Sequence, residues 1–115
     1  MNKKYSILVV DDELRELDSI QKFIKGKKHK ATCVHTMDEA LKALDREHFD
    51  VLLTDIHLSE QEGVPHVLQI LRMVSERNQK ILPLAMSQDP NIETFDQALA
   101  YGALQFIRKP ITGWD

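Results

Sequence analysis

The hydrophobic positions of this chain fall into short apolar runs separated by stretches with helical spacing. Five runs predict strands, over residues 5–10, 30–34, 51–55, 81–86 and 104–107. Runs of this length, rich in β-branched residues and bounded by polar turns, are typical of strands buried in a parallel sheet. The run at 30–34 is more polar than the others, which favours an edge position for it. Pro83 cannot donate a ladder hydrogen bond, so we expect an irregularity or a locally unpaired position there.

Helical spacing separates each predicted strand from the next. Leu14, Leu17, Ile20 and Ile24 recur at steps of three and four residues, and Gly26 is placed as a helix stop. Similar patterns begin at Asp38, after Gly63 and after residues 89–91. This alternation predicts a flavodoxin-like α/β fold, with a five-stranded parallel sheet in the order 2-1-3-4-5 and helices on both faces.

Composition narrows the class of protein. A chain of 115 residues with 43% hydrophobic and 29% charged residues fits one globular domain. A net charge of −3 gives no case for direct nucleic-acid binding. Four lysines surround Gly26, and we interpret them as a solvated turn. The single Cys33 excludes an internal disulfide and predicts a buried, inert thiol. No apolar stretch reaches membrane-spanning length, so we expect a cytoplasmic protein.

Polar residues follow four of the five predicted strands. Asp11 and Asp12 follow the first strand, Asp55 ends the third, Ser87 follows the fourth and Lys109 follows the fifth. Each has an ordinary alternative: an acid can cap a helix, a serine can occupy a turn and a lysine can be solvated. In the predicted strand order, however, the first and third strands are neighbours. Their acids should therefore meet at the carboxyl edge of the sheet, where α/β proteins place ligands.

Three converging carboxylates repel one another unless a cation lies among them. Ligand sets made only of oxygen suit Mg²⁺, which takes one or two carboxylates together with waters and phosphate oxygens. A carboxylate can also act as a nucleophile and form an aspartyl phosphate. A metal and a lysine would then neutralise the charge of the transferred group. The residue types at this edge therefore predict magnesium-dependent phosphoryl transfer.

Over residues 5–110 the chain resembles the receiver domain of two-component response regulators, the family that includes single-domain chemotaxis regulators. The resemblance is carried by residues 7–13, by residues 50–55 with Gly63 eight positions later, by Ala85-Met86-Ser87 and by residues 101–110. It implies a signalling switch and not an enzyme with a separate substrate, although such a domain catalyses its own phosphotransfer and autodephosphorylation.

The resemblance also implies a role for each site residue. Asp55 would accept the phosphoryl group from a histidine kinase or phosphotransfer protein. Asp12 would bind Mg²⁺ most directly and Asp11 partly through water, with the backbone carbonyl of His57 as a further ligand. Lys109 would pair with the phosphoryl group. In response, Ser87 would move to bond a phosphoryl oxygen and Phe106 would turn inward, which would remodel a protein-interaction face.

Three positions depart from the family pattern. Ser59 occupies a position that is usually proline, and Gln88 occupies one that is usually a small residue. Pro83 stands one position later than the proline that usually opens the fourth strand. None of these removes a catalytic group, and we expect a competent phosphoacceptor with altered kinetics.

The family also ends with a fifth helix, whereas only five residues follow Pro110 here. We therefore expect residues 1–115 to form a receiver domain truncated before or within its last helix. The uncovered sheet face would then favour self-association, an effector domain or a partner protein.

The main alternative is a pseudo-receiver, a phosphorylation-independent binding or dimerisation module of the same fold. The chain keeps all of the residues expected for phosphorylation, and this argues against a pseudo-receiver: Asp11, Asp12, Asp55, Ser87 and Lys109. A hydrolase acting through an aspartyl phosphate fits less well, because the chain offers neither a general acid for the leaving group nor a cap domain.

Overall fold

The structure is a computed structural model that describes residues 3–56, 71–74, 76, 80–87, 96–97, 99–100, 103 and 105–108. The predicted helix after Gly63 is described only in part, as is the one after residues 89–91. The segment after Arg108, where we expect the domain to be truncated before or within its last helix, lies outside the described residues.

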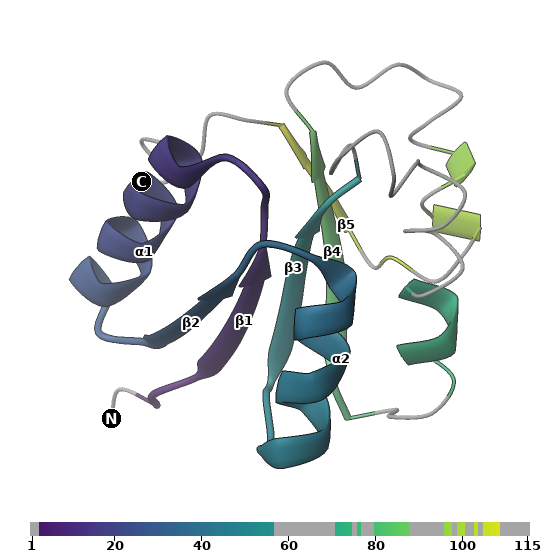
Figure 1. Cartoon of the computed structure of the whole chain (residues 1–115), viewed down its shortest axis with the longest axis horizontal. Helices are drawn as coiled ribbons and strands as arrows, with labels where there is room; N and C mark the ends of the chain where they lie inside the picture. Colours follow the sequence, from purple (N-terminus) through teal and green to yellow (C-terminus); the bar gives the residue numbers. More distant parts are fainter. Residues whose placement is uncertain are drawn as a thin grey trace.

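A five-stranded parallel sheet forms the centre of the molecule (Figure 1). Its strands are β1 (Ser6–Val10), β2 (Lys30–Val34), β3 (Val51–Asp55), β4 (Leu82–Ser87) and β5 (Gln105–Arg108). They lie in the order β2-β1-β3-β4-β5, and each neighbouring pair is parallel. The predicted flavodoxin-like strand order is confirmed, and the more polar strand β2 lies at an edge.

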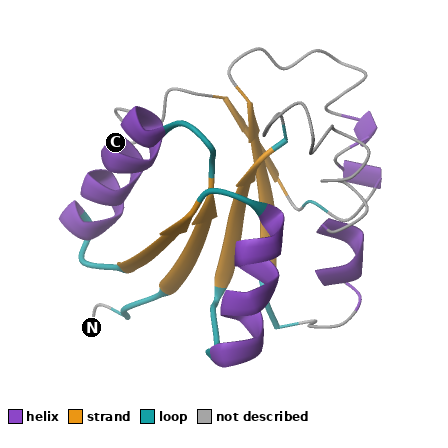
Figure 2. Ribbon diagram, viewed as in Figure 1, coloured by secondary structure: helices purple, strands orange, loops and turns teal. Residues whose placement is uncertain are grey.

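Helices cover both faces of the sheet (Figure 2). Helix α1 (Leu14–Gly26) packs on one face, in a cluster that includes Val9, Leu53 and Met86. Helix α2 (Met37–Arg46) packs on the other, in a cluster that includes Leu8 and Leu52. Adjacent strand residues such as Leu52 and Leu53 thus belong to opposite clusters, as the pleat of a strand requires. This two-sided burial explains why the central strands are apolar without alternation.

The buried stripe of α1 is narrower than its spacing predicts. Leu17, Ile20 and Ile24 are buried, but Leu14 is 70% exposed although it belongs to the same helical period. At about 100° per residue, Leu14 lies roughly 60–120° around the helix from the three buried side chains. It is also the first residue of the helix, and the buried side chains begin only at Leu17.

Helix α2 begins at a capping box. The Thr36 hydroxyl accepts a hydrogen bond from the Glu39 backbone N–H at 3.1 Å, and the Glu39 carboxylate accepts one from the His35 N–H at 3.2 Å. These bonds satisfy backbone donors that the first helical turn leaves open. They also fix the next residue, Met37, which is fully buried against the sheet.

Pro83 lies inside β4 without interrupting the ladder to β3, where it pairs with Leu52. The Leu82 N–H bonds to the Asp50 carbonyl, so the backbone groups of Leu82 face β3. Because directions alternate along a strand, those of Pro83 face β5, whose described pairing begins only at Leu84. On the β3 side, where Pro83 pairs with Leu52, the expected irregularity is not found. On the β5 side the neighbouring position lies outside the described residues, and the irregularity stays a prediction there.

Asp50 ties together the starting ends of three strands. Its carboxylate accepts a hydrogen bond from the Ser6 N–H at 2.8 Å, and its own N–H donates to the Ser6 carbonyl at 2.8 Å. Its carbonyl accepts from Leu82. These bonds set the register of β1, β3 and β4 at their amino ends. The register in turn aligns the residues at the carboxyl ends of the same strands.

In the described part of the chain, no helix has the length and apolar character needed to span a membrane.

Candidate functional site

Asp11 is the first residue beyond β1 and is fully buried. Its N–H donates to the carbonyl of Val34 in the edge strand β2 at 3.1 Å. One carboxylate oxygen accepts a hydrogen bond from the Glu13 N–H at 3.0 Å, closing a turn that leads into α1. Asp11 therefore holds the loop in which Asp12 is the exposed neighbour. The sequence indicated an acidic pair here but not this difference in burial.

Asp55 ends β3 and is only 5% exposed. It pairs with Met86 of β4, and the following Ile56 N–H bonds to the Met86 carbonyl at 3.1 Å. The preceding residue, Thr54, is fully buried and pairs with Val10 of β1. The end of β3 is thus paired with both neighbouring strands, through Thr54 to β1 and through Asp55 to β4, which fixes the backbone of Asp55 at the sheet edge.

The carboxylates of Asp11, Asp12 and Asp55 converge as the sequence predicts. Each contributes an oxygen, and these oxygens all lie within 4.8 Å of one another. Two of the three groups are almost completely buried, so their charges are poorly screened by water and need a cation nearby.

The donor set fits Mg²⁺. Two oxygens bound directly to one Mg²⁺ are at most about 4.2 Å apart. A 4.8 Å cluster therefore fits an ion held directly by some carboxylates and through water by another.

The other half of the site lies on β4 and β5. Ser87 ends β4, is fully buried and pairs with Arg108 of β5. Asp55 and Ser87 end adjacent strands, so the predicted hydroxyl lies on the same edge as the acids. Phe106 lies in β5 opposite Ala85, two residues before the end of that strand. The side chain of Phe106 is outside the described part of the structure.

Four residues singled out from the sequence cannot be placed. Lys109, His57, Ser59 and Gln88 lie outside the described residues. Lys109 directly follows β5, and His57 comes two residues after β3. Their roles remain those that the family resemblance implies.

Thr54 and Met37 support the site in a way that the sequence reasoning missed. The Thr54 hydroxyl lies 3.0 Å from the Asp55 carbonyl oxygen and 3.7 Å from the Met37 sulfur, within donating distance of both. This contact joins the start of α2 to the strand end that carries Asp55. A lone hydroxyl in an apolar strand, directly before an acid, was the available signal. Its partner Met37 is 17 residues away and could not be found from spacing.

The comparisons with known proteins agree with this geometry. The profile of the family described as "Response regulator receiver domain" matches residues 7–114. "Putative two-component response regulator ARR13" of Arabidopsis thaliana is 31% identical over 117 aligned residues, which cover 97% of this chain and 19% of that protein. "Transcriptional regulatory protein ZraR" of Salmonella typhimurium is 29% identical, over 94% of this chain and 24% of that protein.

Solved structures share the fold. A crystal structure of NtrX from Brucella abortus has a TM-score of 0.84 and 28% identity, over 95% of this chain and 24% of that one. The chain thus spans about a fifth to a quarter of each of these longer proteins.

The profile covers nearly the whole chain, the strand order is that of the fold, and three acids converge at the expected edge. This chain belongs to the family of response regulator receiver domains.

Proposed function

We propose that this domain is a phosphorylation-controlled switch in which Asp55 accepts a phosphoryl group from a histidine kinase or a phosphotransfer protein. The carrying observation is the convergence of the Asp11, Asp12 and Asp55 carboxylates within 4.8 Å at the carboxyl edge of the sheet. Among these, Asp55 ends the central strand β3, pairs with Met86 of β4 and follows Thr54, which pairs with β1. A carboxylate on a backbone fixed in this way, beside two further acids, suits a nucleophile for phosphoryl transfer.

In the transfer step, a carboxylate oxygen of Asp55 forms a bond to phosphorus. The bond from phosphorus to the imidazole nitrogen of the donor breaks, and the imidazole leaves with the bonding electrons. Hydrolysis later returns Asp55 to a carboxylate and releases inorganic phosphate. The fixed backbone position of Asp55 lowers the entropic cost of the transfer step, because this nucleophile is already placed at the sheet edge. In the later hydrolysis water is the nucleophile and the Asp55 carboxylate is the leaving group.

We propose Mg²⁺ as the cofactor, held by Asp12 and Asp55, by Asp11 partly through water, and by the backbone carbonyl of His57. When bound, the ion neutralises charge on the phosphoryl oxygens during transfer. The oxygen-only set and the burial of Asp11 and Asp55 support this assignment. In the same proposal, Lys109 pairs with the phosphoryl group from the end of β5.

The switch is proposed to run through β4 and β5. Ser87 would donate its hydroxyl hydrogen to a phosphoryl oxygen, and Phe106 would move in response. The register supports this coupling, because Ala85 pairs with Phe106 and Ser87 pairs with Arg108. Movement at Ser87 therefore acts on the strand that carries Phe106. The output would be a changed protein-interaction face beside β5.

The partners follow from the longer relatives. The matched Salmonella protein is named a transcriptional regulatory protein, and this chain covers 24% of it. We propose that the domain controls an effector domain or a partner protein in the cytoplasm, with self-association as a further mode of contact. The receiver domain itself is not proposed to contact nucleic acid.

Intact-mass spectrometry after incubation with acetyl phosphate tests the proposal. Wild type with Mg²⁺ should gain one phosphoryl group, whereas Asp55→Asn with Mg²⁺ and wild type without metal should gain none. If folded wild type gains no adduct with Mg²⁺ present, the domain is a pseudo-receiver that binds partners without phosphorylation.

A further inference from the structure

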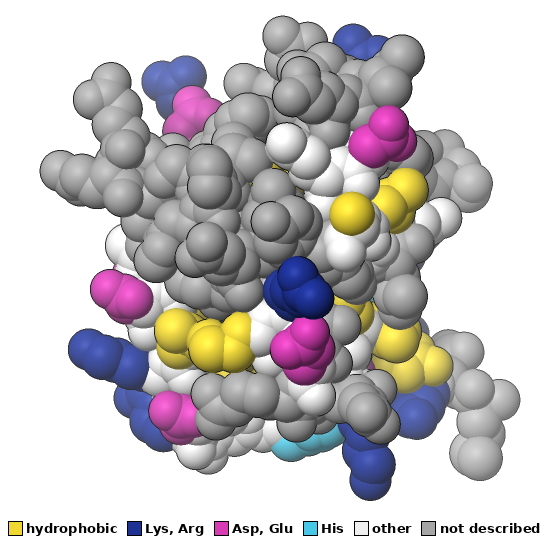
Figure 3. Space-filling view, turned by 90° about the vertical axis from the view of Figure 1, so that its right-hand side faces the viewer, with side chains coloured by type: hydrophobic (Ala, Val, Ile, Leu, Met, Phe, Trp, Pro, Cys, Tyr) yellow, Lys and Arg dark blue, Asp and Glu magenta, His cyan; other side chains and the backbone are white. Residues whose placement is uncertain are grey.

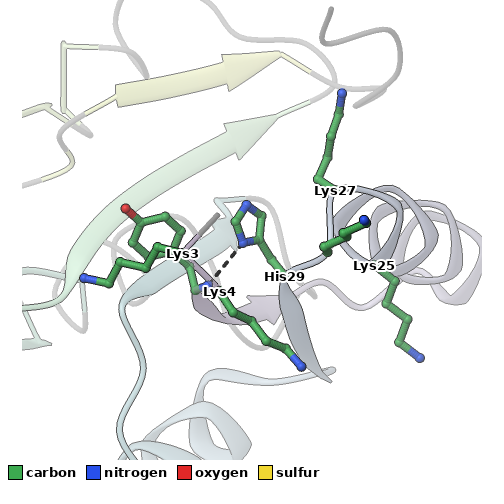
Figure 4. Close-up of a pocket in the computed structure, with 7 residues that line it drawn as sticks. Lys3, Lys4, Lys25, Lys27 and His29 are labelled. Carbon is green, nitrogen blue, oxygen red and sulfur yellow. Dashed lines mark hydrogen bonds between the residues drawn. The ribbon is translucent and has the colours of Figure 1, made fainter. Parts of the chain in front are cut away.

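A cluster of lysines surrounds a hollow at the amino edge of the sheet, opposite the carboxylates. Lys3 and Lys4 come from the segment before β1, and Lys25, Lys27 and Lys28 come from the end of α1 and the turn after it. Tyr5 and His29 also line this basic hollow, whose volume is about 830 Å³. Figure 4 shows His29 between the two groups of lysines. The length of β1, roughly 16 Å, separates the hollow from Asp11.

The turn that presents Lys27 and Lys28 is fixed by its backbone. The Lys28 N–H donates to the Lys25 carbonyl at 2.9 Å, and the His29 N–H donates to the Ile24 carbonyl at 3.1 Å. Lys28 has φ 65°, in the left-handed region that glycine and asparagine usually occupy. A lysine therefore stands where the backbone favours a smaller residue. Because α1 carbonyls are used in these bonds, the negative end of the helix is partly neutralised.

Aromatic contacts hold the two sides of the basic hollow together. The Tyr5 N–H donates to Nδ1 of His29 at 3.1 Å. The two rings lie with centroids 5.2 Å apart, and the Lys30 N–H bonds to the Tyr5 carbonyl at 2.9 Å. The ammonium group of Lys3 lies 5.3 Å from the centre of the Tyr5 ring. The hollow is thus defined by ordered contacts between segments 24 residues apart.

All of the described acid–base side chains of fixed charge that line the basic hollow are lysines, so its charge is positive. It gathers five of the ten lysines of a chain whose net charge is −3, and none of its described lining residues is acidic. In the described part of the chain, the ion pairs of lysine involve Lys22 and Lys30 and none of these five. Asp50 interacts weakly with Lys3 but is held by the Ser6 N–H and His48. By contrast, the face in Figure 3 shows acidic and basic side chains interspersed. Five like charges around one hollow favour a multiply charged anion.

We propose that the basic hollow binds a small soluble anion with several linked phosphate groups, either inorganic or as the phosphate chain of a nucleotide. Lysine ammonium groups bind phosphate as point charges, and five of them line this hollow. The volume lies in the range of small-ligand sites, about 300–1,000 Å³, but the lining is polar rather than apolar. The exposed Tyr5 ring offers a surface on which a nucleobase could stack.

Titration calorimetry with inorganic triphosphate in magnesium-free buffer tests this site. Wild type should bind one triphosphate per chain, with a Kd that rises as added salt screens the lysines. Lys27→Gln/Lys28→Gln should raise the Kd about tenfold, and Lys3→Gln/Lys4→Gln, on the other side of the hollow, should do the same. The matched control Lys22→Gln/Lys42→Gln removes equal charge from exposed positions on α1 and α2 and should change the Kd less than twofold.

Nucleotides distinguish the two sources of phosphate. Equal affinity for ATP and triphosphate would assign the site to the phosphate chain alone. Tighter binding of ATP that is lost in Tyr5→Leu would assign it to nucleotides. The proposal is overturned if wild type does not bind triphosphate, or if the control variant weakens binding as much as the hollow variants. Tighter lysine-dependent binding of a single-stranded oligonucleotide or of anionic vesicles would also overturn it.

Discussion

The charge of Asp12 has opposite effects with and without a metal. Asp12 is exposed, but its carboxylate belongs to a cluster in which Asp11 and Asp55 are buried. Without a cation, its negative charge raises the energy of the folded state, because the three groups are brought together only on folding. With Mg²⁺ bound, the same charge contributes to holding the ion.

Asp12→Asn should therefore stabilise the metal-free domain by about 1 kcal/mol, a value reduced by the solvent exposure of Asp12. Urea denaturation with and without Mg²⁺ measures the effect. With excess Mg²⁺ the order should reverse, because wild type gains more binding free energy than the variant.

Asp45→Asn is the control, since it removes an exposed charge from the far end of α2. It should change the free energy of unfolding by less than about 0.5 kcal/mol in either condition. If Asp12→Asn and Asp45→Asn respond alike, the acidic cluster is not the source of the effect.

At the scale of elements, the cap of α2 supports the site indirectly. Thr36 caps the helix whose first residue, Met37, contacts the Thr54 hydroxyl beside Asp55. Thr36→Ala should lower the free energy of unfolding by about 1 kcal/mol, because the Glu39 N–H loses its acceptor. Thr36→Ser keeps the acceptor and should retain most of the stability in urea denaturation. Equal losses in the two variants would show that the hydroxyl does not act as the cap.

Asp50, whose hydrogen bonds set the strand register, makes the stability of the fold depend on pH. The hydrogen bond from the Ser6 N–H, with smaller contributions from His48 and Lys3, lowers the pKa of Asp50 below its ordinary 3.8. A carboxyl group whose pKa is lower in the folded protein stabilises the fold above its unfolded pKa. That stabilisation is lost as the pH falls through the lower, folded value.

Asp50→Asn should therefore be less stable than wild type at neutral pH. The difference in unfolding free energy should shrink as the pH falls below 3.8 and toward the lowered pKa of Asp50 in the folded protein. Thermal or urea unfolding of both proteins across pH 3 to 7 measures it. A difference that stays constant over this range would mean that the Asp50 charge does not contribute to the fold.

At the scale of the whole molecule, the strand order and the meeting of the acids were predictable because both follow from periodicity and topology. The apolar runs ending at Val10 and Asp55 predicted adjacent buried strands, and these strands are neighbours. Contacts between segments distant in sequence were not predictable in this way. The turn lysines were interpreted as solvated because nothing in their spacing indicated that Lys3 and Lys4 lie beside them.

Leu14 shows a second limit of prediction from spacing alone. Its spacing matches the buried stripe of α1, yet its position at the first turn leaves it exposed. Helical spacing gives the face of a residue only to within a broad sector, and where the helix crosses the sheet decides the rest.

The central claim, that Asp55 is the phosphoacceptor, is tested most directly by mapping the modified residue. Borohydride reduces an aspartyl phosphate to homoserine, which marks the position permanently. Trypsin cuts after lysine and arginine, so Asp55 falls in the peptide 47–72 and the other two acids fall in 5–15. After treatment with acetyl phosphate and Mg²⁺, homoserine should appear at position 55 and be absent from 5–15. Homoserine at Asp11 or Asp12, or none in folded protein with Mg²⁺ present, would contradict the assignment.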